Sequence, residues 1–184
     1  GIVKIMLDGV IESHTAAMLA PYADRPGETG HANYTQAELD AAIGMMDRRG
    51  WQIMTHALGD RAVRMALNAY EKAAKDNPAP AKGRRHKIEH IESIDPAEVP
   101  RFAELGVTAS LQPDHAGGMA NPARSSARWT YLGTLRSAWG WPWKSIKDAG
   151  GRIAFGSDWP VATLDIGPGM WIAMNRQPNP PVPD

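Results

Sequence analysis

The chain has 184 residues, of which 43% are hydrophobic, enough to build the core of a single domain over residues 1–184. Its 20 basic and 20 acidic residues balance, so charge favours neither a nucleic acid nor a membrane as partner. No apolar run approaches the roughly 20 residues of a membrane span, and the absence of cysteine limits any metal site to nitrogen and oxygen ligands.

The first half of the chain predicts two strands that alternate with two helices. Residues 3–7 predict a buried strand, and the polar stretch over residues 8–34 is too long for a simple connection, which favours a functional or substrate-facing role. Thr35 and Glu38 form a capping box for a helix that ends before Gly50. Residues 52–56 predict the second strand, and Asp60 is predicted to be the N-cap of the next helix.

The second half continues the alternation. Residues 86–90 predict a third strand, and Pro96 opens a helix that Pro100 should kink or split. After a fourth strand over residues 107–111, the composition predicts a second long loop over about residues 112–131. The last expected elements are a helix over 143–149, a fifth strand over 152–158 and a short helix over 170–176. Five strands and five helices in strict alternation predict a parallel sheet with crossover helices.

Both ends of the chain are interpreted as cut. The sequence starts at Gly1, without a methionine, and closes in a proline-rich stretch over residues 177–184 that cannot form regular structure. The chain is therefore expected to be a piece of a longer protein. The compartment is left open, with a cytoplasmic location favoured, because any N-terminal signal would lie outside this chain.

Four candidate metal ligands lie in or just after the predicted strands: Lys4, His56, His90 and Asp158. A β/α barrel collects ligands from several strands at its C-terminal face. Hydrolytic metal centres need imidazole and carboxylate donors that converge on one point. Each residue alone has a structural alternative: a core histidine, a turn-capping aspartate, or a lysine whose ammonium group reaches water at the strand end. All four structural alternatives would have to hold independently, each at a strand end in one series. Because this would be a large coincidence, the set predicts a metal site.

Three further histidines, His14, His31 and His115, fall in predicted loops. They are interpreted as exposed or substrate-facing rather than as metal ligands. Gln112 and His115 are candidates for substrate contact, and the loops around His14, Tyr22 and Trp129 are weaker ones.

Several motifs spread along the whole chain are specific in combination. They are Val-Lys-Ile-Met-Leu-Asp-Gly from residue 3, Thr-Ala-Ala-Met from residue 15, Thr-His-Ala-Leu-Gly-Asp from residue 55, Ile-Glu-His from residue 88, Arg-Phe-Ala-Glu-Leu-Gly from residue 101, Ser-Leu-Gln-Pro from residue 110 and Gly-Ser-Asp-Trp-Pro-Val from residue 156. This combination resembles the amidohydrolase superfamily. Within it, the chain resembles the amidohydrolase-3 group, which includes N-substituted formamide deformylases and exoenzyme regulatory proteins.

The resemblance implies a distorted β/α barrel with one or two divalent metal ions, usually zinc. Lys4 matches a fourth-strand lysine that can be carboxylated to bridge two metals, since an ammonium group would repel them. His56 and His90 match the histidine ligands of the fifth and sixth strands. Asp158 matches the eighth-strand aspartate, which binds metal and takes a proton from the attacking water.

The chain departs from this family in one respect: it has no His-x-His pair, which the family carries on its first strand. It therefore resembles a partial TIM-like (β/α) barrel of class α/β, roughly the C-terminal five units of a metal-dependent hydrolase. Such a piece exposes inner faces, so a homo-oligomer or a chain that completes the barrel is expected.

The predicted function is metal-dependent hydrolysis of non-peptide carbon–nitrogen bonds, of amide type, in a small-molecule substrate, with this fragment inactive on its own. The alternative is a non-catalytic half-barrel that acts as an assembly or regulatory module. The missing His-x-His pair favours the alternative for the fragment as it stands.

Overall fold

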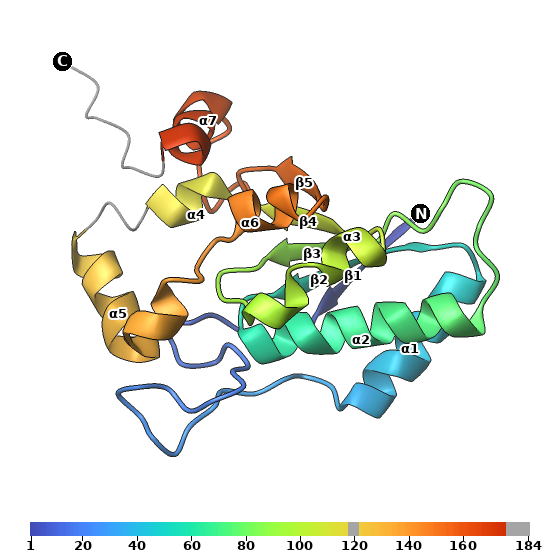
Figure 1. The fold of residues 1–184 in the computed structure, drawn as a ribbon, viewed down its shortest axis with the longest axis horizontal. Helices are drawn as coiled ribbons and strands as arrows, with labels where there is room; N and C mark the ends of the chain where they lie inside the picture. Colours follow the sequence, from blue (N-terminus) through green and yellow to red (C-terminus); the bar gives the residue numbers. More distant parts are fainter. Residues whose placement is uncertain (118–121, 176–184) are drawn as a thin grey trace.

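A sheet of five parallel strands forms the centre of the molecule (Figure 1). The structure is a computed structural model that describes residues 1–117 and 122–175. Neighbouring strands follow the order of the chain, which confirms the predicted parallel α/β sheet. The strands are β1 (Ile2–Met6), β2 (Gln52–Ala57), β3 (Lys87–His90), β4 (Thr108–Leu111) and β5 (Arg152–Phe155).

The helices begin and end largely where the sequence indicates. They are α1 (Gln36–Arg48), α2 (Asp60–Asp76), the 3₁₀ helix η1 (Pro96–Glu98), α3 (Arg101–Glu104), α4 (Pro113–Gly117), α5 (Pro122–Ser137), α6 (Trp143–Asp148) and α7 (Ile166–Asn175). The capping box of Thr35 and Glu38 starts α1, and Pro100 separates η1 from α3, as predicted. Within the described residues, no helix combines the length and the apolar character that crossing a bilayer requires.

The predicted second long loop is wrong. The stretch over residues 112–131 contains α4 and part of α5, so three helices rather than one connect β4 to β5. Its glycine, proline and serine content suggested a loop, but tertiary packing overrides composition here. Leu132 of α5 is buried, and the carbonyl of Tyr131 accepts a hydrogen bond from Ala23 N at 2.7 Å.

The predicted N-cap of α2 is also wrong. Gly59 occupies that position, and the carboxylate of Asp60 instead accepts a hydrogen bond from Leu19 N at 2.7 Å. A side chain at residue 59 would place its Cβ 2.1 Å from the carbonyl oxygen of Ala17, so only glycine fits. The start of α2 is thus fitted against the segment that follows β1.

That segment, residues 8–34, has no helix or strand but is firmly held. Arg136 of α5 donates hydrogen bonds to the carbonyls of Ala20 and Pro21, at 2.9 and 2.6 Å. A small hydrophobic cluster joins the segment to α5, consisting of Ile11, Ala16, Met18, Tyr22, Leu58 and Leu132. Figure 1 shows the segment and α5 together on one side of the molecule, beyond the ends of the strands.

The two faces of the sheet differ in burial. Ile5 and Thr55 pair across β1 and β2 and are buried in the core with α1 and α2. The preceding pair, Lys4 and Met54, points to the opposite face and remains exposed or half-buried. A closed barrel would cover its inner face with the remaining strands. The open face is therefore what a partial barrel leaves uncovered.

Candidate metal centre

The predicted ligands line one cavity at the carboxyl ends of the strands. Lys4 comes from β1, His56 from β2 and His90 from the last position of β3, whereas Asp158 follows β5. The cavity has a volume of about 380 Å³, a size typical of small-molecule sites. The structure therefore brings together the four residues that their strand-end positions singled out.

Left-handed backbone conformations direct two of these side chains. His90 has a φ of 76°, followed by Ile91 at 50°, and Asp158 has a φ of 56°. Strict alternation along β3 would send the His90 side chain to the face of the buried Ile88, so the change of backbone conformation lets it join the cavity instead. Such conformations cost about 1–3 kcal/mol each outside glycine and cluster at functional sites.

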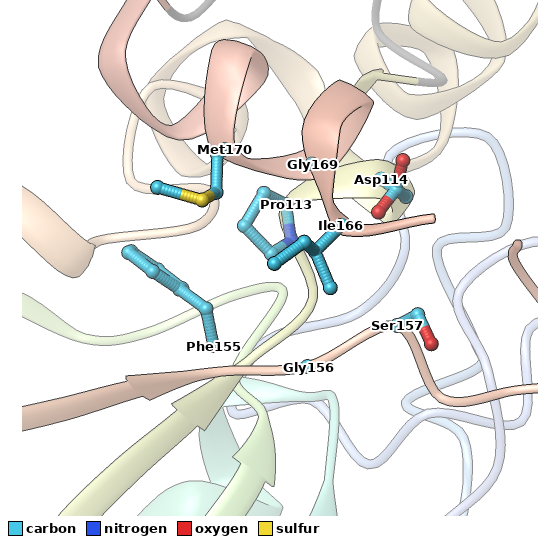
Figure 2. A pocket seen from close by; sticks show the side chains of 8 residues that line it. All are labelled: Pro113, Asp114, Phe155, Gly156, Ser157, Ile166, Gly169 and Met170. Atoms are coloured by element: carbon cyan, nitrogen blue, oxygen red, sulfur yellow. The ribbon is translucent and has the colours of Figure 1, made fainter. Parts of the chain in front are cut away.

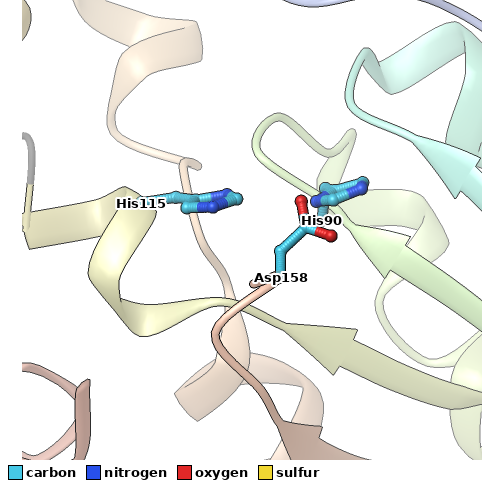
Figure 3. A group of neighbouring side chains, drawn as sticks. All are labelled: His90, His115 and Asp158. Atoms are coloured by element: carbon cyan, nitrogen blue, oxygen red, sulfur yellow. The ribbon is translucent and has the colours of Figure 1, made fainter. Parts of the chain in front are cut away.

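Three groups lie close enough together to share one metal ion. A ring nitrogen of His90, a ring nitrogen of His115 and a carboxylate oxygen of Asp158 all lie within 4.8 Å of one another. Figure 3 shows the two imidazoles side by side with the Asp158 carboxylate beside His90. The His56 ring meets the His90 ring edge-on, with centroids 4.6 Å apart. The His115 ring stacks on the His90 ring, with centroids 5.9 Å apart.

The protonation states of the histidines suit a metal. Burial, together with the neighbouring His56 and His115, lowers the pKa of His90 to about 3. Burial also lowers the pKa of His56. Both rings are therefore neutral near pH 7, the form in which imidazole offers a lone pair. Neutral imidazoles with one carboxylate are a donor set that fits a divalent cation such as zinc.

Lys4 lies on the open face of the sheet and is 39% exposed at its side chain. Its ammonium nitrogen lies 2.9 Å from a carboxylate oxygen of Glu89. Lys4 thus gives the largely buried Glu89 carboxylate of β3 the opposite charge that such a group requires. The carboxylated form of Lys4 and its role as a ligand remain predictions.

His115 does not lie in a loop, as the sequence suggested, but in α4. Its position within the metal-sized group makes it a ligand candidate in addition to a substrate contact. Gln112 is buried just after β4, where its side chain counteracts the lowering of the His90 pKa. Contact of Gln112 and His115 with a substrate remains a prediction.

The remaining candidates lie away from the cavity or outside the described side chains. The expectation that His14 is exposed is wrong. Its ring is buried between Tyr22 and Tyr131 and is hydrogen-bonded to Asp24 at 2.9 Å. The Tyr22 hydroxyl donates to a backbone carbonyl. His31 is exposed, as predicted. The side chain of Trp129 lies outside the part of the chain that the structure describes.

Two acidic residues near the cavity were not singled out by the sequence. Asp8, directly after β1, accepts three backbone hydrogen bonds and lies 3.8 Å from His56 Nε2, and burial raises its pKa to about 6. Glu92 lies 3.8 Å from His115 Nδ1 and 3.9 Å from the buried Arg128. Their only sequence signal is proximity to the candidate ligands, two residues after His90 in the case of Glu92.

A second cavity, of about 250 Å³, lies between α4, the end of β5 and α7 (Figure 2). Phe155, Ile166 and Met170 give it an apolar wall, and Asp114 is its acidic residue. It borders the segments that carry His115 and Asp158 but contains none of the predicted ligands. The candidate metal centre therefore belongs to the first cavity.

The parallel strands, the open face and the donors at the strand ends together define part of a (β/α) barrel suited to a divalent metal. A family model described as the amidohydrolase family matches residues 1–179. The chain belongs to this family, which confirms the resemblance of its motifs and supports a hydrolase at the level of the family.

Known proteins agree with this assignment. The chain is 35% identical to Protein LONG AFTER FAR-RED 3 of Arabidopsis thaliana, over 90% of this chain and 27% of that protein. It is 26% identical to an N-substituted formamide deformylase of Arthrobacter pascens, over 78% of this chain and 25% of that protein. The chain thus spans about a quarter of the length of these two relatives.

A solved structure gives the same result for the fold. An uncharacterized metal-dependent hydrolase from Pyrococcus furiosus superposes with a TM-score of 0.80 at 26% identity. The match covers 97% of this chain and 35% of that one. The prediction of a partial (β/α) barrel is therefore confirmed.

Proposed function

We propose that the protein to which this chain belongs is a metal-dependent hydrolase that cleaves carbon–nitrogen bonds of amide type in a small molecule. The observation that carries the proposal is the convergence of His90, His115 and Asp158 at the carboxyl ends of the strands. The deformylase among the relatives, by its name, acts on N-substituted formamides, and this supports an amide-type bond for the present chain.

The donor set supports a metal in this cavity. His56, His90, His115 and Asp158 would hold it, and Lys4 would join them in its carboxylated form. A bound divalent ion, for which zinc is the best match, would polarise a carbonyl group and lower the pKa of water towards about 7. A cavity of about 380 Å³ admits a small amide but not a folded protein.

Asp158 is the proposed catalytic residue. Its carboxylate would take a proton from water as the water oxygen adds to the amide carbon, and would then deliver that proton to the departing nitrogen. Its left-handed backbone conformation aims the carboxylate towards His90, which keeps the base beside the donors rather than in solvent.

Metal binding and hydrolysis test this proposal. The chain should bind Zn²⁺ or Co²⁺ in a titration, and His90→Ala or Asp158→Ala should weaken binding strongly. His31→Ala is the matched control, because His31 is exposed. In the longer protein, hydrolysis of N-acyl or N-formyl amides should cease with a chelator and return with Zn²⁺. Hydrolysis that persists without metal would refute the proposal.

The open face of the sheet favours a second candidate, a non-catalytic module that assembles with another chain. Ile2 is 53% exposed and Met6 is 47% exposed on that face. A second copy or a chain that completes the barrel would remove this apolar surface from water. Sedimentation tests the assembly, and metal analysis separates the two functions, because a module has no need of zinc. A stable monomer would count against a partner.

A further inference from the structure

Asp8 is a buried carboxylate at the point where β1 ends, and its side chain has no exposed surface. It accepts hydrogen bonds from the backbone nitrogens of Ala17, Leu58 and Gly59, at 2.9, 3.0 and 2.9 Å. The first of these donors belongs to segment 8–34 and the other two follow β2. The Asp8 carboxylate therefore links the segment that follows β1 to the segment that follows β2. Such bonds are what a buried charge requires.

The backbone around Asp8 is closely fitted. A Cβ at Gly9 would lie 2.0 Å from Thr15 Oγ1, and one at Gly59 would lie 2.1 Å from the carbonyl oxygen of Ala17. Glycine is required at both positions, because any side chain would push the two connections apart. The position of the Gly9 carbonyl is therefore fixed by packing and by the Asp8 bonds together.

The His56 ring points one nitrogen at this arrangement. His56 Nε2 lies 3.3 Å from the Gly9 carbonyl oxygen and 3.8 Å from Asp8 Oδ1. A carbonyl and a carboxylate accept hydrogen bonds but cannot donate them. A proton on Nε2 donates to the Gly9 carbonyl and faces the Asp8 carboxylate, whereas a lone pair there would face two acceptors. A neutral ring protonated at Nε2 carries its lone pair on Nδ1.

We infer that Asp8 is a positioning residue of the metal centre. With the Gly9 carbonyl, it fixes His56 in the tautomer protonated at Nε2 and so makes Nδ1 the metal donor. Histidine ligands commonly donate their second ring N–H to a carboxylate or a backbone carbonyl, and loss of that partner weakens metal binding about 10- to 100-fold. The inference rests on the proposed function, since it gives Asp8 a role towards the metal.

Two readouts test it separately. The first is the tautomer of His56 in the metal-free chain, read from the ring nitrogens of ¹⁵N-labelled histidine by NMR, with His56→Gln to assign the signal. The second is a Co²⁺ titration followed by visible absorption, which reports both affinity and coordination geometry. The variants are Asp8→Asn and, as matched control, Asp60→Asn, because Asp60 is also buried against segment 8–34 but binds Leu19 N instead.

The wild type should show His56 protonated at Nε2, and Asp60→Asn should keep both this tautomer and the Co²⁺ affinity. Asp8→Asn should give a mixture of tautomers, a Co²⁺ affinity about 10- to 100-fold weaker and an altered absorption spectrum. If Asp8→Asn does not fold, Asp8→Glu, which keeps the charge but displaces it, should give the same two changes.

Two results would overturn the inference. One is a wild-type His56 protonated at Nδ1, a measurement that needs no variant. The other is a folded Asp8→Asn or Asp8→Glu chain with unchanged tautomer and unchanged Co²⁺ affinity. A wild type that keeps the Nε2 proton but binds no Co²⁺ would overturn the metal centre and with it the role of Asp8 towards the metal. The tautomer thus distinguishes failure of the proposed function from a wrong assignment of Asp8.

Discussion

Strand β3 has a histidine at each end, and the two lie in opposite kinds of surroundings. His86, before the strand, belongs to an N-terminal cluster with Asp47, Asn77 and Arg84. His90, at the carboxyl end, belongs to a C-terminal cluster with His56, His115 and Asp158. Both rings are buried, at 2% and 4% exposure. Burial alone therefore does not separate a structural histidine from a functional one.

The partners separate them. His86 Nδ1 accepts a hydrogen bond from Ile53 N at 3.2 Å, and its Nε2 lies 3.1 Å from Asp47 Oδ1. Asp47 also accepts hydrogen bonds from Arg84 and Asn77, at 2.9 Å each. The N-terminal cluster thus pairs opposite charges and matched donors, which stabilises the fold.

In the C-terminal cluster, like groups face one another. Burial lowers the pKa of both rings; the two imidazoles beside His90 add to this lowering, whereas the Asp47 carboxylate beside His86 counteracts it. Three imidazoles and a carboxylate gain little from contact among themselves but gain a great deal from a shared cation. In a β/α barrel, the carboxyl ends of the strands carry function and the opposite ends carry stability. The contacts at the two ends of β3 agree with this division, with the N-terminal cluster stabilising and the C-terminal cluster proposed to be functional.

The largest expected effect is on catalysis. His90→Ala in the longer protein should reduce amide hydrolysis to background, because it removes the residue central to the C-terminal cluster. The fold should persist, since His90 is a neutral ring that lines the cavity. Steady-state hydrolysis and circular dichroism measure the two effects. His86→Asn should retain hydrolysis per folded molecule, and an active His90→Ala protein would break the comparison.

The next effect is on stability. Asp47→Ala should lower the free energy of unfolding by about 3–5 kcal/mol, because it leaves the partly buried Arg84 and the buried His86 without their carboxylate. Urea unfolding measures this change, and Co²⁺ affinity should remain close to wild type. Asp76→Ala is the control: its pair with Lys72 is half-exposed, so its loss should cost far less. Equal losses in both variants would contradict the prediction.

The sequence predicts the strands and the metal ligands from the same signal. Apolar runs with a polar residue at their end identify β2 and β3 together with His56 and His90, because parallel strands deliver their carboxyl ends to one edge. The sequence separates His86 from His90 by position alone, since His86 precedes the four-residue strand and His90 is its last residue. The partners of each ring come from distant segments, so only the structure shows them.

The parts that the sequence missed depend on contacts between distant segments. Helix α5 is held by Leu132 and by Arg136 bonds to segment 8–34, which no local pattern reveals. His115 joins the candidate ligands only because α4 forms directly after β4. Asp8 resembles a turn residue in the sequence, and its burial depends on backbone donors about 50 residues away in the chain, such as Leu58 N.

A third prediction sharpens the comparison with metal itself. Zn²⁺ at about a hundredfold excess over its dissociation constant should raise the free energy of unfolding by about 2.7 kcal/mol, because it binds the folded chain. Thermal or urea unfolding with and without Zn²⁺ measures the gain. The gain should vanish in Asp158→Ala and survive in His86→Asn. If the gain is lost in His86→Asn instead, the metal binds at the N-terminal cluster and its assignment to the C-terminal cluster is wrong.

The smallest effect concerns pH and the N-terminal cluster. Burial lowers the pKa of His86 from its ordinary value of 6.5, although the Asp47 carboxylate counteracts this. The unfolded chain therefore takes up the proton at a higher pH than the folded chain. The stability that neutral His86 contributes is present above pH 6.5 and is lost as the pH falls towards the lower pKa of the folded state.

This loss can be isolated from other titrating groups by comparing two proteins. One proton changes the free energy of unfolding by at most about 1.4 kcal/mol per pH unit. Urea unfolding of wild type and His86→Asn from about pH 7.5 to about pH 5 should show a stability difference that shrinks on acidification. His56 and Asp8 titrate in both proteins, so their contributions cancel in the difference. A difference that stays constant with pH would mean that His86 has the same pKa in the folded and the unfolded chain. The N-terminal cluster would then stabilise the fold by packing rather than through the buried, neutral ring.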